Sequence, residues 1–331
     1  MFFKNVIDNY YFCIYNTGVY KTTKGFNMPV FMKLHLIPIM HKVLKSNPDL
    51  QKSIGDLVFL HRSDLKNIDW SKAKVFVPCE PTAVPWIKIA LSQLPKDVNF
   101  TTAFLGGNNE RYKNNSLQTK LARLMTIFNG YKLKPFVNGI ESEIISDMAK
   151  DVLHGPVELE TKSSNTKANW ENALKQGMLD GIETVIIVAS NEGVVRHIGT
   201  LKAALKKQNI DVGKFNILAW PYTPTIKSDN MNLWQNFLGI KFPLPSDLVV
   251  CDKDNINTSV WGMYRTFMEL FAIDRWSKQG DVYLTDEQKQ LLKNIFDFKT
   301  LAFAFGKTAI AEIKETQNKV LKVIANKVNL K

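Results

Sequence analysis

Between residues 70 and 221, short apolar runs alternate with segments whose apolar residues recur at three- and four-residue steps. This alternation is typical of βαβ units, in which consecutive strands form a parallel sheet. The clearest example is the run 183–190, ETVIIVAS, which is followed by an amphipathic helical pattern over 194–208. The sequence therefore predicts an α/β fold with a doubly wound, mainly parallel sheet of five or six strands.

The same reading gives the predicted elements. Strands are predicted at 73–79, 99–107, 134–139, 156–160, 183–190 and 215–221, and helices at 82–94, 116–130, 141–153, 165–181 and 194–208. An aromatic helix is expected at 258–277. Thr285 and Gln288 have the spacing of a capping box, which predicts another helix start. We divide the chain into an N-terminal extension packing on the core (1–97), an α/β core (98–225), an irregular connection with a closing helix (226–284) and a C-terminal amphipathic helical segment (285–331).

Charge and cysteine content limit the partners and the location. The formal net charge is +12, which favours phosphates, anionic lipids or acidic substrates as partners. The lysines are scattered singly along the chain, so a Lys-rich solvated surface is favoured over nucleic-acid binding. The three cysteines lack CxxC spacing, which argues against disulfides and zinc and favours a cytoplasmic protein. The apolar run 28–40 is too short to span a bilayer, so no transmembrane segment is expected, while peripheral membrane contact stays open.

Small polar residues follow four of the predicted strands. They are Gly106, Gly107 and Asn108; Asn138 and Gly139; Ser163, Asn165 and Thr166; and Ser190, Asn191 and Arg196. Because ligands bind beyond the carboxyl ends of strands in an open parallel sheet, these residues are expected to share one binding site. The alternative is that each loop merely uses the residues that helix caps and turns prefer. Four loops meeting at one rim favour the joint site.

Two carboxylates are candidates for catalysis at this rim. Glu143 and Glu160 each follow a strand end, where a carboxylate can bind ribose hydroxyls, a water or a metal. A first-turn acid such as Glu143 can instead interact only with the helix dipole. Arg196 can clamp a phosphate, or form a salt bridge to Glu143 or Glu160. Asn169 lies one helical turn from Asn165, so both are candidate ligand contacts.

Several common motifs are absent from the sequence. There is no GxxxxGK[ST], GxGxxG, GxSxG or EF-hand pattern, and the five histidines form no metal-binding cluster. A serine hydrolase is therefore disfavoured, and no metal site is predicted.

The segments NGIESEIISDM, VELETKSSNTKANWENA and TVIIVASNEGVVRH together resemble the SanA/YdcF/ElyC-like family of bacterial proteins. The resemblance covers residues 98–225 and, more weakly, 258–280. Two positions depart from the family pattern: Ala168 replaces a Glu, and Gly193 occupies the position of a His. His197, the nearest imidazole along the chain, is expected to point elsewhere on its helix.

The resemblance implies a Rossmann-like α/β protein linked to envelope or lipid-carrier biology, with S-adenosylmethionine or another nucleotide as a cofactor. On this basis we expect a small-molecule-binding protein for a nucleotide-like or phosphate-bearing anion. If it is an enzyme, group transfer or phosphoester hydrolysis suits its polar anchors and carboxylates. The alternative is a non-enzymatic scaffold with a vestigial cleft, whose terminal helices bind a partner or a membrane surface.

Overall fold

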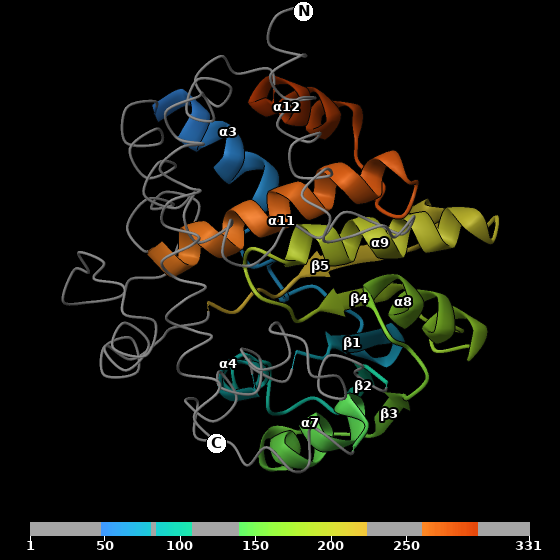
Figure 1. Ribbon diagram of the computed structural model, residues 1–331. Helices are drawn as coiled ribbons and strands as arrows, with labels where there is room; N and C mark the ends of the chain where they lie inside the picture. Colours follow the sequence, from blue (N-terminus) through green and yellow to red (C-terminus); the bar gives the residue numbers. More distant parts are fainter. Residues whose placement is uncertain (1–47, 81–83, 108–138, 224–259, 297–331) are drawn as a thin grey trace, which may run out of the picture.

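The computed structural model describes residues 48–80, 84–107, 139–223 and 260–296 (Figure 1). The predicted helix 116–130, most of the predicted strand 134–139, Asn108 and Asn138 lie outside these residues. The described chain forms a five-stranded, all-parallel sheet in the order β3-β2-β1-β4-β5. The strands are β1 (Ala73–Pro78), β2 (Thr101–Leu105), β3 (Val157–Glu160), β4 (Thr184–Ile187) and β5 (Asn216–Ala219). The predicted doubly wound α/β fold is thereby confirmed.

Helices cover both faces of the sheet (Figure 1). One face carries α4 (Val84–Ser92) and α7 (Glu141–Ala149), and the other carries α8 (Thr166–Lys175) and α9 (Val194–Lys207). Helices α3 (Pro48–Val58), α11 (Val260–Lys278) and α12 (Asp286–Phe296) form an outer layer over α9. Short 3-10 turns occupy Trp70–Lys72, Lys150–Val152 and Val212–Lys214.

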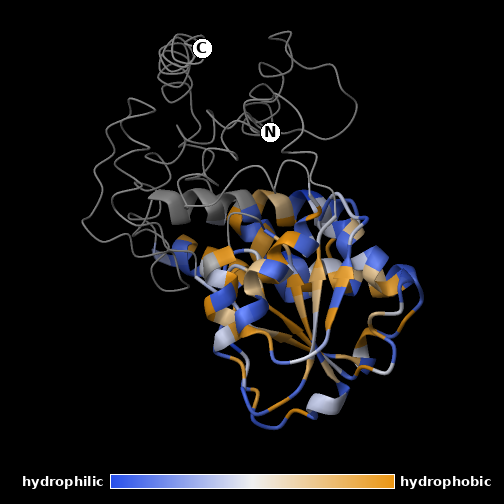
Figure 2. Ribbon diagram, turned by 90° about the horizontal axis from the view of Figure 1, so that it is seen from below, coloured by the Kyte–Doolittle hydropathy of each residue, from blue (hydrophilic) through white to orange (hydrophobic). Residues whose placement is uncertain are grey.

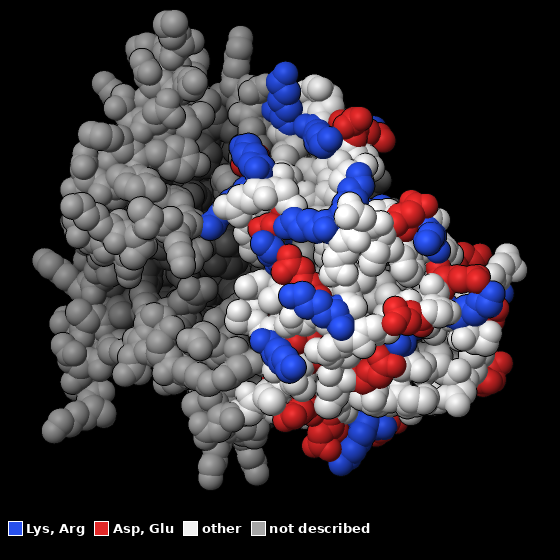
Figure 3. Space-filling model, turned by 90° about the vertical axis from the view of Figure 1, so that its right-hand side faces the viewer, with Lys and Arg blue, Asp and Glu red and all other residues white. Residues whose placement is uncertain are grey.

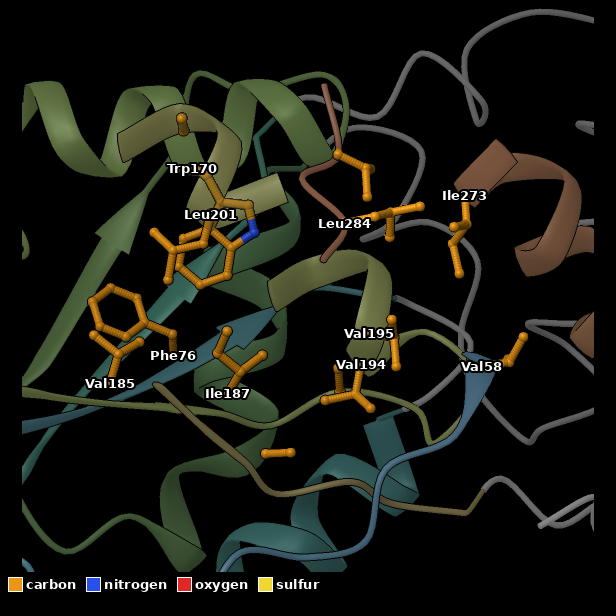
Figure 4. Close-up of a cluster of buried hydrophobic side chains, with 14 of the residues drawn as sticks. Val58, Phe76, Trp170, Val185, Ile187, Val194, Val195, Leu201, Ile273 and Leu284 are labelled. Atoms are coloured by element: carbon orange, nitrogen blue, oxygen red, sulfur yellow. The ribbon is translucent and has the colours of Figure 1, made fainter. Parts of the chain in front are cut away.

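Side chains of the strands alternate between two hydrophobic cores, as the pleat of a β-strand requires. Phe76 and Ile187 point into the core beneath α8 and α9, whereas Val75 and Ile186 point into the core beneath α4 and α7. Figure 2 shows these apolar strands enclosed between the two helical layers. In the first core, the Trp170 and Phe76 rings lie 5.5 Å apart between their centroids (Figure 4). A strand that is buried on both faces is largely apolar, which is why β4, buried along its whole length, lies in the continuous apolar run TVIIVA.

The sheet begins earlier in the chain than the predicted core boundary at residue 98. Strand β1 is the central strand, paired with β2 on one side and β4 on the other. Residues 73–92, which we assigned to the N-terminal extension, therefore belong to the α/β unit. Helix α3 of that extension packs against α9, α11 and α12.

The predicted capping box is present at the start of α12. The backbone N–H of Gln288 donates to Thr285 Oγ1 at 3.2 Å, and the backbone N–H of Thr285 donates to Gln288 Oε1 at 3.0 Å. Helix α8 ends at Lys175, short of the predicted residue 181, and Gly177 and Gly181 follow it with φ angles of 69° and 72°. Glycine adopts such angles without steric cost, so these residues end the helical conformation. Within the described ranges, no helix combines the length and the apolarity needed to cross a membrane.

Candidate functional site

The strand order indicates where a ligand site lies in this fold. The order reverses between β1 and β4, and in open α/β sheets the crevice beyond the carboxyl ends at such a switch point binds ligands. Cys79 follows β1 there, and Ser190, Asn191 and Glu192 follow β4. Next to them, Gly106 follows β2 and Glu160 is the last residue of β3. The four polar loops that the sequence singled out thus lie at this edge wherever the structure describes them.

Glu160 is the most constrained polar residue of the rim, and its side chain is fully buried. Its Oε1 accepts hydrogen bonds from the backbone N–H groups of Lys162 at 2.7 Å and Ser163 at 3.0 Å, and from Asn172 Nδ2 at 3.1 Å. Its Oε2 is buried without a hydrogen-bond partner among the described residues. The three hydrogen bonds to Oε1 therefore hold the side chain in place. Oε2 is a buried acceptor that has no hydrogen-bond partner in the described part of the chain.

Cys79 and Glu141 flank the same rim, and the sequence analysis identified neither. A Cβ placed on Gly106 would lie 2.7 Å from Cys79 Cβ and 3.2 Å from Glu141 Oε2, so both side chains pack against this glycine. Burial, reinforced by the negative charges of Glu141 and Glu160, raises the pKa of the Cys79 thiol well above its usual value. The thiol is therefore protonated at neutral pH and is a poor nucleophile.

The two glycines after β2 serve packing in this structure. A Cβ on Gly107 would meet Ser163 O at 2.4 Å, Ser163 N at 2.6 Å and Thr161 O at 2.7 Å, all of them backbone atoms. The Gly107 N–H donates to Ser163 Oγ at 3.1 Å, and the Gly106 N–H donates to Glu160 O at 3.1 Å. The space beside Gly107, which we expected a ligand to use, is filled by the loop after β3.

We expect Gly107→Ala to lower the free energy of unfolding by about 2 kcal/mol, the usual scale of overpacking. The added methyl group meets backbone atoms of the neighbouring loop, which can yield only by moving away from β2. Gly213→Ala is the matched control, because Gly213 is exposed and its nearest atom is a side-chain oxygen of exposed Asp211 at 3.3 Å. Urea denaturation of both variants checks the difference, and equal stabilities would contradict the packing role.

The polar run after β3 mostly makes local hydrogen bonds. Asn165 caps α8, since its Oδ1 accepts from the Ala168 N–H at 2.9 Å. Asn169 is buried and its Nδ2 donates to Leu105 O at 3.2 Å, which ties α8 to the end of β2. Thr166 Oγ1 accepts from Arg196. Each of these three side chains thus has a structural role at the position where we expected ligand contacts.

The first turn of α7 differs from the expectation for Glu143. Glu143 is exposed, whereas Glu141 packs against Gly106 and Cys79. Ser142 is fully buried, and its Oγ donates to Glu160 O at 2.9 Å. The carboxylate that this helix brings to the rim is therefore Glu141, two residues before the predicted one. Gly139 leads into the helix and is partly exposed.

Arg196 is paired with a residue that the sequence analysis did not connect to it. Its guanidinium donates to both carboxylate oxygens of Glu269 on α11, one contact being 3.1 Å, and to Thr166 Oγ1 at 2.7 Å. It also lies 5.2 Å from the centroid of the Trp276 ring. The expected salt bridge to Glu143 or Glu160 is not the one the structure shows. Arg196 instead links α8, α9 and α11.

The loop after β4 is buried and makes hydrogen bonds within itself and to the segment that follows β5. Ser190 O accepts from the N–H groups of Gly193 and Val194, both at 2.9 Å, and the Asn191 N–H donates to Tyr222 O at 2.8 Å. Asn191 Oδ1 accepts from the Glu192 N–H at 2.9 Å. Ser190 O thus satisfies the first N–H of α9, whereas Asn191 bonds within the loop and to Tyr222, and no side chain of the described residues caps the start of the helix.

His197 lies one helical turn after Gly193 on α9. Its Cδ2 is 3.8 Å from the position that a Cβ on Gly193 would take. Burial and the charge of Arg196 lower the pKa of His197 well below its usual value, so the imidazole is neutral. Its Nδ1 is buried and, in the described part of the chain, accepts no hydrogen bond.

Charges of both signs are mixed on the described surface. On the face in Figure 3, Lys and Arg side chains are interspersed with Asp and Glu. Among residues 48–80, 84–107, 139–223 and 260–296, no three His, Cys, Asp or Glu side chains come together as a metal site.

No family model, curated protein or solved structure matches this chain.

Proposed function

We propose that this chain is a small-molecule-binding α/β protein of the SanA/YdcF-like kind. In this proposal, a nucleotide-like or phosphate-bearing ligand, S-adenosylmethionine among the candidates, binds at the carboxyl edge of the sheet near the switch point of β1 and β4. The scattered cysteines favour a cytoplasmic location. The observation that carries the proposal is the unpartnered Oε2 of Glu160.

A buried acceptor without a partner is costly, so such groups are uncommon outside functional sites. Leaving one unsatisfied costs about 1–3 kcal/mol, and more when the group is charged. Here the cost falls on a carboxylate that three donors hold in place at the edge where this fold binds ligands. A ligand, a cation or a water at Oε2 would remove that cost. A rigid carboxylate with one available oxygen suits binding of hydroxyl groups and, where turnover occurs, group transfer or phosphoester hydrolysis.

The test is a thermal-shift screen of the full chain against nucleotides, S-adenosylmethionine, sugar nucleotides and pyrophosphate. A ligand at a hundred times its dissociation constant stabilises the folded state by about 2.7 kcal/mol. We expect a hit with the wild-type chain that weakens in Glu160→Gln. The matched control is Glu183→Gln, which changes an exposed carboxylate paired with Lys72 before the start of β4. A hit that both variants keep unchanged would place the ligand elsewhere.

The second candidate is a non-enzymatic scaffold with a vestigial cleft. The observation that favours it concerns Arg196, which we expected to bind phosphate. Its guanidinium instead donates hydrogen bonds to Glu269 and Thr166. This candidate predicts no hit in the screen. It also predicts that the chain sediments with anionic phosphatidylglycerol vesicles, or with a protein partner, and that Glu160→Gln has no effect on this.

A further inference from the structure

A phosphate-bearing ligand at the carboxyl edge of the sheet is best held by a cation, and Arg196 is already engaged. The Arg196 guanidinium donates hydrogen bonds to Glu269 and Thr166. Arg62, which the sequence analysis did not identify, is a second arginine close to this edge. Its Nε donates to Pro221 O at 3.1 Å, and Pro221 comes two residues after the end of β5. Arg62 therefore lies where the strands of the sheet end.

The chain around Arg62 is fixed against the end of β5. The Ser63 N–H donates to Ala219 O at 2.9 Å, and the Ala219 N–H donates to Ser63 Oγ at 3.0 Å. The guanidinium carbon of Arg62 lies 4.8 Å from the centroid of the Trp220 ring. Trp220 is itself held in place, because its Nε1 donates to Ala90 O at 3.0 Å. A stacked guanidinium whose Nε is already bonded has little freedom left to lose when a ligand binds.

The two terminal nitrogens of Arg62 are available to a ligand. The residue is exposed, and within the described ranges these nitrogens have neither a hydrogen-bond acceptor nor a carboxylate partner. Partial burial of the side chain lowers the pKa of Arg62, as expected for a cation that loses water without gaining a carboxylate. A guanidinium nevertheless stays charged at neutral pH. Arg62 is thus a charged and accessible donor.

A short backbone path connects Arg62 to the switch point. Tyr222, the residue after Pro221, forms a parallel bridge with Ser190, and its carbonyl oxygen accepts from the Asn191 N–H at 2.8 Å. Ser190 and Asn191 belong to the loop after β4, one of the two strands between which the strand order reverses. Arg62 therefore borders the crevice in which this kind of fold binds its ligands.

We infer that Arg62 binds the phosphate of the ligand through its two terminal nitrogens, while its Nε keeps its hydrogen bond to Pro221 O. The planar guanidinium matches two oxygens of a phosphate, and charge-assisted hydrogen bonds of this paired kind are stronger than neutral ones. This inference rests on the proposed function and specifies which residue recognises the charge of the ligand.

The experiment measures the dissociation constant of pyrophosphate for the full chain by isothermal titration calorimetry at one fixed salt concentration. We expect Arg62→Met to raise this constant about 10-fold or more, the scale of one hydrogen bond to a charged group. Lys214→Met is the matched control, because it removes an exposed positive charge near the other end of β5, and it is expected to leave the constant unchanged. If Arg62→Met does not fold, Arg62→Lys decides the outcome. It keeps the charge without the planar fork and is expected to bind pyrophosphate more weakly than the wild type does.

Absence of pyrophosphate binding to the wild-type chain, or equal affinity in Arg62→Met and Lys214→Met, overturns the inference. Titration of ATP into Arg62→Met and Glu160→Gln separates it from the proposed function. ATP binding that weakens in Glu160→Gln but not in Arg62→Met supports the proposed function and overturns the role of Arg62. Binding of both ligands that weakens in Arg62→Met and is unchanged in Glu160→Gln supports the anion site at Arg62 and counts against the proposed function, which Glu160 carries.

Discussion

Arg196→Met is expected to lower the free energy of unfolding by about 3 kcal/mol. The variant leaves Glu269 with an uncompensated charge in a site where the two side chains are only 13% and 15% exposed. It also removes the hydrogen bond to Thr166 and the contact with the Trp276 ring, so α11 loses its polar attachment to α8 and α9. Urea denaturation followed by circular dichroism measures the change.

Two further variants show whether the loss comes from the buried charge. Lys72→Met breaks the exposed Lys72–Glu183 pair, whose side chains are 49% and 62% exposed, and is expected to cost less than about 1 kcal/mol. The double variant Arg196→Met/Glu269→Leu removes both charges and should recover most of the stability lost in Arg196→Met. If the double variant loses as much unfolding free energy as Arg196→Met and Glu269→Leu lose together when made singly, this explanation is contradicted.

Trp170→Ala is expected to lower the free energy of unfolding by about 3–5 kcal/mol, the range for deleting a large aromatic side chain from a core. Trp170 is fully buried between α8 and the sheet and packs against Phe76. Figure 4 shows that Leu201 of α9 lies in the same cluster. The deletion leaves a cavity where both helices meet the sheet.

Trp170→Phe is the informative companion of this variant. The indole Nε1–H is buried without a hydrogen-bond partner in the described structure, so the tryptophan carries a polar cost that phenylalanine lacks. We therefore expect Trp170→Phe to cost at least about 2 kcal/mol less than Trp170→Ala. Thermal unfolding of the two variants checks this, and equal losses would show that the indole shape, and not apolar volume, determines the packing.

The fold followed from the sequence because its signals are local. An apolar run such as 184–187 is buried on both faces of the sheet, and few alternatives suit such a run. The capping box at Thr285 and Gln288 could likewise be predicted from the sequence, since it depends on two residues three positions apart. The helix end at Lys175 was missed because Gly177 was read as part of a continuing helix, although its positive φ ends the helical turn.

The candidate site could be predicted only in outline. The rim loops were identified because the strand ends of a parallel sheet share one edge, and Glu160 was among them. Choosing Glu141 over Glu143 requires knowing how α7 is rotated against β2, which no local pattern gives. The partner of Arg196 is 73 residues away in sequence, so its pairing depends on the docking of α11. Cys79 was missed because the site was sought only among the loops after later strands.

The central position of β1 has a consequence for synthesis of the chain on the ribosome. Lys74 of β1 is in register with Thr101 of β2 on one side and with Val185 of β4 on the other. Until residues beyond 187 have emerged, a nascent chain can complete only the β3-β2-β1 half, with one edge of its most apolar strand unpaired. Open apolar edges of this kind template aggregation. The interval between translation of residue 78 and residue 187 is therefore the period in which the β4-facing edge of β1 is open.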